Sequence, residues 1–143
     1  MSQTQSQAQT HPSPSATLWI GRAMSAVPTL FLLVDGIMKL VKPAVVVETT
    51  VQLGYPESVI TGLGIVLLIS TALYVIPQTA ALGAILLTGY LGGAVATHVR
   101  VGGDLFSVAF PAIVGALLWG RLVLRNPRLR ALIPGGDRVP LLS

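Results

Sequence analysis

Four long apolar stretches alternate with short polar or turn-forming segments along the chain. They lie at residues 17–40, 58–76, 79–99 and 105–124. A helix needs about 20 mostly apolar residues to cross the hydrocarbon core of a bilayer, and each stretch has roughly that length. None of them has a polar residue at every third or fourth position, as an amphipathic helix of a soluble protein does. The pattern predicts an all-α integral membrane protein, a four-helix bundle.

The segments between and around the stretches set the predicted domain limits. Residues 1–16 contain no charged side chain and lack the positive start of a signal peptide, so we expect a disordered polar tail. Residues 17–124 form the predicted four-transmembrane-helix domain, with one long loop at residues 41–57. Only Pro77 and Gln78 separate the second and third stretches, which predicts a tight helical hairpin. Residues 125–143 are expected to form a basic, unstructured C-terminal tail.

Composition supports a membrane protein and narrows its chemistry. The 143 residues are 52% hydrophobic and 10% charged, whereas soluble domains have about 25% charged residues. Cysteine is absent, which excludes disulfides, thiolate metal sites and thiol–disulfide chemistry by this chain. The net charge is +4, but the basic residues gather beside the last stretch instead of spreading like a nucleic-acid footprint. We therefore expect membrane lipids, and no nucleic acid, as partners.

The distribution of Lys and Arg predicts an orientation. Four spans place both termini on one side of the membrane. That side carries Arg22, Arg125, Arg128, Arg130 and Arg138, and the other carries Lys39, Lys42 and Arg100. Because cytoplasmic loops are enriched in Lys and Arg, we expect a multi-pass cell-membrane protein with both termini in the cytoplasm (N-in/C-in).

Polar residues within or beside the apolar stretches are candidates for function, because ionisable groups in a bilayer are costly. The predicted topology brings five of them to the outer membrane face: Asp35, Lys39, His98, Arg100 and Asp104. Asp35 and Lys39 are four residues apart, so they share a helix face and can form an ion pair. His98 lies at a similar depth, and histidine titrates near neutral pH.

Two interpretations of this polar cluster remain open. In the first, the ion pair and the histidine are structural and hold the first and third spans together. In the second, the cluster is a pocket that binds a head group, such as a quinone carbonyl, or passes a proton. In both, the contact between the first and third spans is where function is expected.

Small and interfacial residues give further candidates. Gly89, Gly92 and Gly93 in the third stretch, with Gly89 and Gly93 as a GxxxG pair, allow close helix packing. This packing is either internal to the bundle or a self-association face. Near the membrane surfaces we expect interfacial anchors, and these are Trp19, Arg22, Trp119 and Arg121.

Motifs for catalysis or metal binding are not found. The sequence has no phosphate-binding loop, no dinucleotide glycine pattern and no HExxH. His98 is the only histidine in an apolar stretch, so one chain does not supply bis-histidine haem ligation. We predict no catalytic residues, no metal and no firmly bound cofactor. A quinone stays open as a ligand, and so does a haem shared between two chains through His98.

Several separated motifs resemble one family. They are DGIMKL at residues 35–40, LGYP at 53–56, LYVIPQTAALGAILLTGYLGGAVATHVR at 73–100 and LRNPRLR at 124–130. In this order and spacing they resemble the DoxX-like family of small bacterial membrane proteins, over about residues 18–132. The resemblance implies a four-helix fold in the bacterial inner membrane. It implies little about activity, because the wider DoxX group has diverse functions. Its members include a membrane subunit of a thiosulfate:quinone oxidoreductase and a mycobacterial protein associated with oxidant defence. Others are receptor-assembly chaperones and cargo receptors.

The sequence is therefore compatible with three functions. The first is a non-catalytic accessory or anchoring subunit, linked to a membrane oxidoreductase or to quinone. The second is a structural or chaperone-like protein that binds other membrane proteins, and the third is small-molecule transport by an oligomer.

Overall fold

The computed structural model describes residues 14–132, and within this range the chain consists of helices joined by turns, with no strand. Its elements are α1 (Pro14–Val41), α2 (Ala44–Gln52), the 3₁₀ turn η1 (Glu57–Val59), α3 (Ile60–Val75), α4 (Ala80–Arg100), α5 (Leu105–Arg125) and α6 (Pro127–Arg130). Residues 1–13 and 133–143, which hold most of the two predicted tails and Arg138, lie outside the described range. So do the side chains of residues 14–18, 20–22, 24 and 25.

Three of the described helical segments are long and apolar enough to cross a membrane: Glu57–Val75, Ala80–Arg100 and Leu105–Arg125. They correspond to the second, third and fourth predicted stretches within a few residues. Large aliphatic side chains such as Ile69, Ile85 and Ile113 are more than half exposed on their outer faces. Exposed apolar surface over whole helices is explained by lipid contact. The prediction of an all-α membrane protein is therefore confirmed, with three of the four predicted spans found as membrane-length apolar helices.

Three segment boundaries differ from the prediction. The predicted long loop contains α2, the predicted C-terminal tail begins with α6, and α1 starts at Pro14, within the predicted N-terminal tail. Helix α2 is short and rich in Val and Thr, whose branched side chains lower helix propensity, so its local helix signal is weak. Lys42 has a positive φ of 54° and Pro43 is extended, with a ψ of 152°, and together they turn the chain from α1 into α2.

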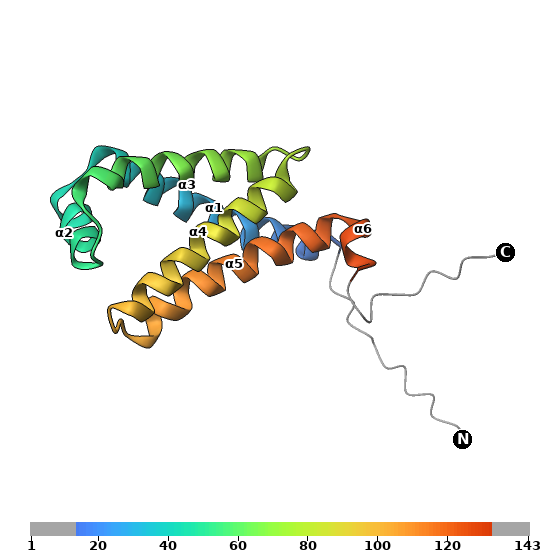
Figure 1. Cartoon of the computed structure of the whole chain (residues 1–143). Coiled ribbons are helices and arrows are strands. Elements are labelled where there is room, and N and C mark those ends of the chain that lie inside the picture. Colours follow the sequence, from blue (N-terminus) through green and yellow to red (C-terminus); the bar gives the residue numbers. More distant parts are fainter. Residues whose placement is uncertain (1–13, 133–143) are drawn as a thin grey trace, which may run out of the picture.

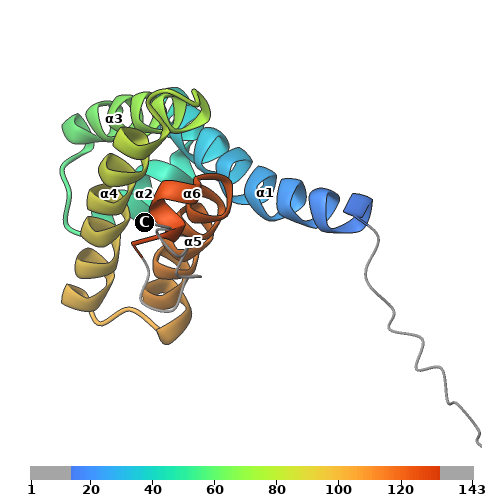
Figure 2. The same ribbon diagram turned by 90° about the vertical axis from the view of Figure 1, so that its right-hand side faces the viewer.

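The long helices form two antiparallel pairs that diverge. Figure 1 shows α4 and α5 side by side, with α1 passing behind them and α3 running from the α2 end to the turn that begins α4. The pairs are close where α3 turns into α4 and separate toward the end that carries α2. In Figure 2 the N-terminal part of α1 extends away from the other helices. A cavity lies between the pairs at the α2 end.

Close contacts at a few small residues hold the helices together. A Cβ on Gly36 of α1 would lie 2.7 Å from the Leu68 side chain, and one on Gly64 of α3 would lie 3.1 Å from the carbonyl oxygen of Gly36. These glycines allow α1 and α3 to approach closely. The edge-to-face pair of Phe31 and Phe110, with ring centroids 5.0 Å apart, joins α1 to α5. Helix α1 therefore packs mainly on α3 and α5. The predicted contact between the first and third spans, which are α1 and α4, is not the main interface of α1.

Candidate functional site

A cavity of about 460 Å³ lies between the diverging helix pairs at the α2 end. Its walls come from five helices and the segment after α2. Apolar side chains and glycines line most of it, and they include Phe31, Leu32, Gly89, Gly93, Ala94, Phe110, Pro111 and Val114. Its polar lining residues are Asp35, Lys39, Thr49, Thr50, Tyr55, Tyr90, Thr97 and His98. Cavities of this size with apolar walls and a few polar groups are typical of small-molecule sites.

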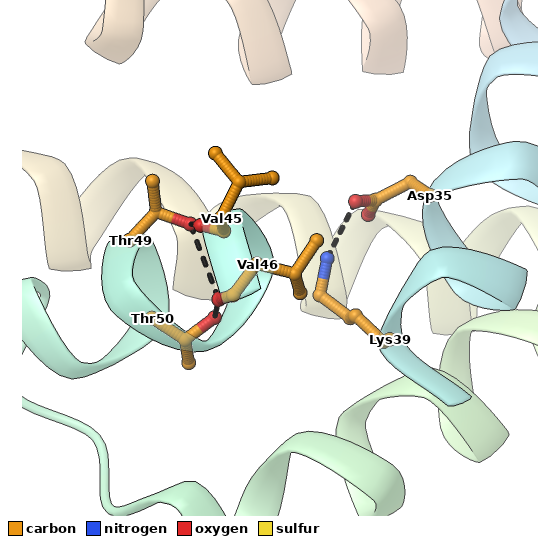
Figure 3. A network of polar contacts seen from close by, with 6 residues as sticks. All are labelled: Asp35, Lys39, Val45, Val46, Thr49 and Thr50. Carbon is orange, nitrogen blue, oxygen red and sulfur yellow. Dashed lines mark hydrogen bonds and ion pairs between the residues drawn. The ribbon is translucent and has the colours of Figure 1, made fainter. Parts of the chain in front are cut away.

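The Asp35–Lys39 ion pair is the charged feature of this cavity. Lys39 Nζ lies 2.6 Å from Asp35 Oδ1, and the side chains are 15% and 31% exposed, respectively. Figure 3 shows both side chains reaching toward each other from α1, with Val46 of α2 beside them. Both partners belong to α1, and His98 makes no hydrogen bond with Asp35. The pair therefore does not itself join α1 to α4.

Helix α2 forms one wall of the cavity and is attached to the rest of the protein by few polar contacts. The hydroxyls of Thr49 and Thr50 donate to the carbonyls of Val45 and Val46 within α2. These bonds use the hydroxyl protons, so the oxygens remain as acceptors at the cavity edge.

Two hydrogen bonds tie the segment after α2 to α4. Arg100 Nη2 donates to the carbonyl oxygen of Leu53 at 2.9 Å. The hydroxyls of Tyr55 and Thr97 are 2.9 Å apart and share one hydrogen bond. Arg100 thus holds the cavity wall in place and does not line the cavity.

Asp104 also lies outside the cavity, because it caps the N-terminus of α5. Its Oδ2 accepts from the amides of Phe106 and Ser107, and its Oδ1 accepts from the Ser107 hydroxyl at 2.6 Å. The hydrogen bonds from Ser107, above all from its hydroxyl, lower the pKa of the Asp104 carboxyl from its ordinary value of 3.8. The predicted cluster is therefore divided: Asp35, Lys39 and His98 share the cavity, whereas Arg100 and Asp104 stabilise its surroundings.

We expect Asp104→Ala to lower the melting temperature of the protein in detergent at neutral pH, because α5 loses its cap. A lowered pKa in the folded state means that the carboxylate stabilises the protein above its unfolded-state pKa, near 3.8, and loses this effect as pH falls through the folded-state pKa. The difference from wild type should thus be constant above about pH 5 and shrink below pH 4. Asp104→Asn, which caps without titrating, is the control. A difference that grows on acidification contradicts the assignment.

Tyr90 is a cavity residue that the sequence prediction missed. It precedes His98 by two helical turns, so both lie on one face of α4. A tyrosine in an apolar stretch is usually assigned to packing or to the membrane surface, and only the divergence of the helix pairs places it beside a cavity. The prediction also missed Phe31 and Phe110. Their rings pack against each other although the residues are far apart in the sequence, and no local pattern indicates such a pair.

The three glycines predicted to mediate packing have open surroundings. A Cβ on Gly89, Gly92 or Gly93 would meet no atom within 4 Å in the described part of the protein. They therefore do not mediate close contacts between the described helices. Gly89 and Gly93 line the cavity and Gly92 does not. Self-association through α4 stays a prediction.

The predicted interfacial residues have different surroundings. Trp19 is 69% exposed, and the side chain of Arg22 lies outside the described residues. Trp119 Nε1 donates to the Thr88 hydroxyl at 2.8 Å and so joins α5 to α4. The Arg121 guanidinium lies over the Tyr74 ring, 5.7 Å from its centroid. Among residues 14–132 there is no group of three His, Asp or Glu side chains that is arranged to hold a metal ion.

Comparison with known families gives one match. The family model described as the DoxX-like family matches residues 23–121, which is more than half of the chain and includes every residue that lines the cavity. Searches of curated proteins and of solved structures give no significant match. The match spans most of α1, all of α2, α3 and α4, and most of α5. This chain therefore belongs to the DoxX-like family of membrane proteins.

Proposed function

We propose that this protein is a four-span, non-catalytic membrane subunit that holds a quinone-like ligand in the cavity between its helix pairs. The observation that carries the proposal is the cavity itself, about 460 Å³ in volume, with apolar walls and a charged, hydrogen-bonding end. A membrane subunit that binds quinone suits an accessory or anchoring role beside an oxidoreductase.

Helix α1 is the fourth span in this proposal. It is 28 residues long, enough to cross a bilayer at 1.5 Å per residue. Its two described charged residues form an ion pair with each other, which lowers the cost of placing them near the membrane. Alternating spans then put the α2 end on the outer side and the basic end of α5 in the cytoplasm, where Lys and Arg are enriched.

The polar end of the cavity matches the carbonyl groups of a quinone. The Lys39 ammonium, the His98 imidazole and the Tyr90 hydroxyl can each donate a hydrogen bond, and a quinone carbonyl accepts one. Phe31, Phe110 and the aliphatic walls match the ring and the start of an isoprenoid tail. The residues hold and orient the ligand, and the proposal assigns no electron transfer to the protein.

Filling the cavity tests this proposal. Gly93 lines the cavity and Gly92 does not, and a Cβ on either meets nothing within 4 Å. We expect Gly93→Leu to weaken binding of decylubiquinone by roughly tenfold or more, because the added side chain takes ligand volume. Gly92→Leu is the matched control, and we expect it to bind within about twofold of wild type. Quenching of tyrosine and tryptophan fluorescence in detergent measures the affinity.

Both glycines are replaced by a better helix former, so lost binding cannot be attributed to a weaker helix. Ala94→Phe fills the cavity from a second lining position. It tests the same prediction if the leucine side chain of the first variant points away from the cavity. Equal affinity in wild type, Gly93→Leu and Ala94→Phe would reject the cavity as the ligand site. Binding by none of them would reject a quinone and leave the structural, chaperone-like function as the alternative.

A further inference from the structure

We propose that the opposite end of the protein carries a specific site for the phosphate of an anionic phospholipid, between the ends of α3 and α5. A second, smaller cavity of about 150 Å³ lies there. It is lined by Tyr74, Val75, Pro77, Ala80, Arg121, Leu122, Arg125 and Asn126. This site is separate from the α2-end cavity and does not depend on the proposed function.

The charges at this end of the protein are unbalanced. Arg121, Arg125, Arg128 and Arg130 lie within ten residues, and no ion pair joins any of them to a carboxylate in the described part of the chain. The described acidic residues belong to the other end, where Glu57 precedes α3 and Asp104 precedes α5. A cluster of cations without carboxylates attracts anions, and it does so more strongly where low-dielectric walls limit screening.

The polar groups that face the small cavity are hydrogen-bond donors. Arg121 and Arg125 are one turn apart on the same face of α5 and both line it. Arg121 is held over the Tyr74 ring, which limits its freedom before a ligand binds. The Asn126 side-chain oxygen accepts from the Arg128 amide, so its NH₂ group is the part that remains for a ligand. Two guanidinium groups and an amide donor suit the oxygens of a phosphodiester.

The location selects a lipid over a soluble anion. Arg125 ends Leu105–Arg125, a segment long and apolar enough to cross a membrane, and Arg121 lies one turn inside it. In a bilayer both guanidinium groups would therefore reach the lipid phosphates. The rest of the cavity wall is apolar, from Val75, Pro77 and Leu122, and this part can contact the glycerol and the first acyl carbons. Basic pockets between membrane helices are known to bind lipid head groups in this way.

Arg125 and Arg128 provide a matched test, because both are exposed and only Arg125 lines the cavity. Native mass spectrometry of the full-length protein in detergent, titrated with phosphatidylglycerol, counts the bound lipids. We expect wild type to retain one lipid tightly, Arg125→Gln to bind it roughly tenfold more weakly and Arg128→Gln to stay within about twofold. Arg121→Gln should match Arg125→Gln, and circular dichroism verifies that each variant is folded.

Two results would overturn the site. Equal weakening by Arg125→Gln and Arg128→Gln means that only the general positive charge attracts the lipid. Equal retention of phosphatidylcholine and phosphatidylglycerol by wild type means that no anion is recognised. A further arm adds inorganic phosphate to the protein in phosphatidylcholine nanodiscs. A rise in melting temperature there as large as that given by phosphatidylglycerol would assign the site to a soluble anion and reject the lipid.

Discussion

Gly83→Ala is expected to destabilise the protein by about 3 kcal/mol, near the upper end of the range for overpacking. A Cβ on Gly83 would overlap the Tyr74 amide nitrogen and lie 2.5 Å from Tyr74 Cα and 2.7 Å from the carbonyl carbon of Leu73. All three atoms belong to the backbone, so no side-chain rotation relieves the overlap. Helices α3 and α4 would have to separate at this close approach.

Neighbouring contacts prevent an easy adjustment of this hairpin. The Thr79 hydroxyl donates to the Leu73 carbonyl at 2.8 Å, and the buried Tyr74 hydroxyl donates to the Leu118 carbonyl of α5 at 2.8 Å. A shift of Tyr74 would therefore disturb α5 as well as α3. We expect the effect to be cooperative over three helices.

The measurement is reversible unfolding in mixed micelles of detergent and sodium dodecyl sulfate. Gly89→Ala is the control on the same helix, because its Cβ meets nothing within 4 Å, and it should be within about 0.5 kcal/mol of wild type or slightly more stable. Equal stability of the two alanine variants would show that the close approach at Gly83 does not exist in the membrane protein.

Breaking the Asp35–Lys39 pair is the second change with a large expected effect. Asp35→Asn leaves the Lys39 ammonium without its partner, and Lys39→Met leaves the Asp35 carboxylate unpaired. Removing one partner of a fully buried pair costs about 3–5 kcal/mol. Because these side chains are 15% and 31% exposed, we expect a smaller loss, of roughly 2 kcal/mol, for each single variant.

The double variant Asp35→Asn/Lys39→Met separates the pair from its two members. It leaves no unpaired charge, so its stability should lie closer to wild type than the sum of the single losses, by at least about 1 kcal/mol. Unfolding in the same mixed micelles gives the four values of the cycle. Strict additivity would mean that the two charges do not interact despite their 2.6 Å separation.

The same double variant distinguishes a structural pair from a ligand-binding one. If the pair only stabilises α1, decylubiquinone should bind the double variant as it binds wild type. If the Lys39 ammonium donates to the head group, as we propose, affinity should stay low although stability has recovered. The measured stability thus reports the structural role of the two residues, and the measured affinity reports their role in ligand binding.

Local signals in the sequence were sufficient for several features. The helices α3, α4 and α5 follow from the length of the apolar stretches, because a bilayer imposes a length that the sequence shows directly. The Asp35–Lys39 pair follows from i, i+4 spacing within one helix. Asp104 also carried a local signal that was misassigned to the polar cluster. An Asp directly before an apolar run is a common N-cap, and that is its position before α5.

The tertiary structure decided what the small and polar residues of α4 do. Gly83 and Gly89 are the same residue type in one apolar stretch, yet one touches the backbone of α3 and the other lines a cavity. Which of them makes contact depends on the angle at which α3 and α4 diverge from their turn, and residue spacing does not encode that angle. The prediction named Gly89, Gly92 and Gly93 for packing, whereas the close approaches between the described helices lie at Gly36, Gly64 and Gly83.

The sequence by itself determined that this protein is helical and apolar enough for a membrane, because span length and charge content are properties of consecutive residues. The predicted topology grouped Asp35, Lys39 and His98 at one membrane face, but only the tertiary structure decided that Tyr90 shares a cavity with them, while Arg100 and Asp104 support its surroundings. The physical reason is that the cavity results from two helix pairs packing tightly at Gly83 and diverging toward α2 (Figure 1). Such a divergence is set by long-range packing, which residue spacing along a single chain does not record.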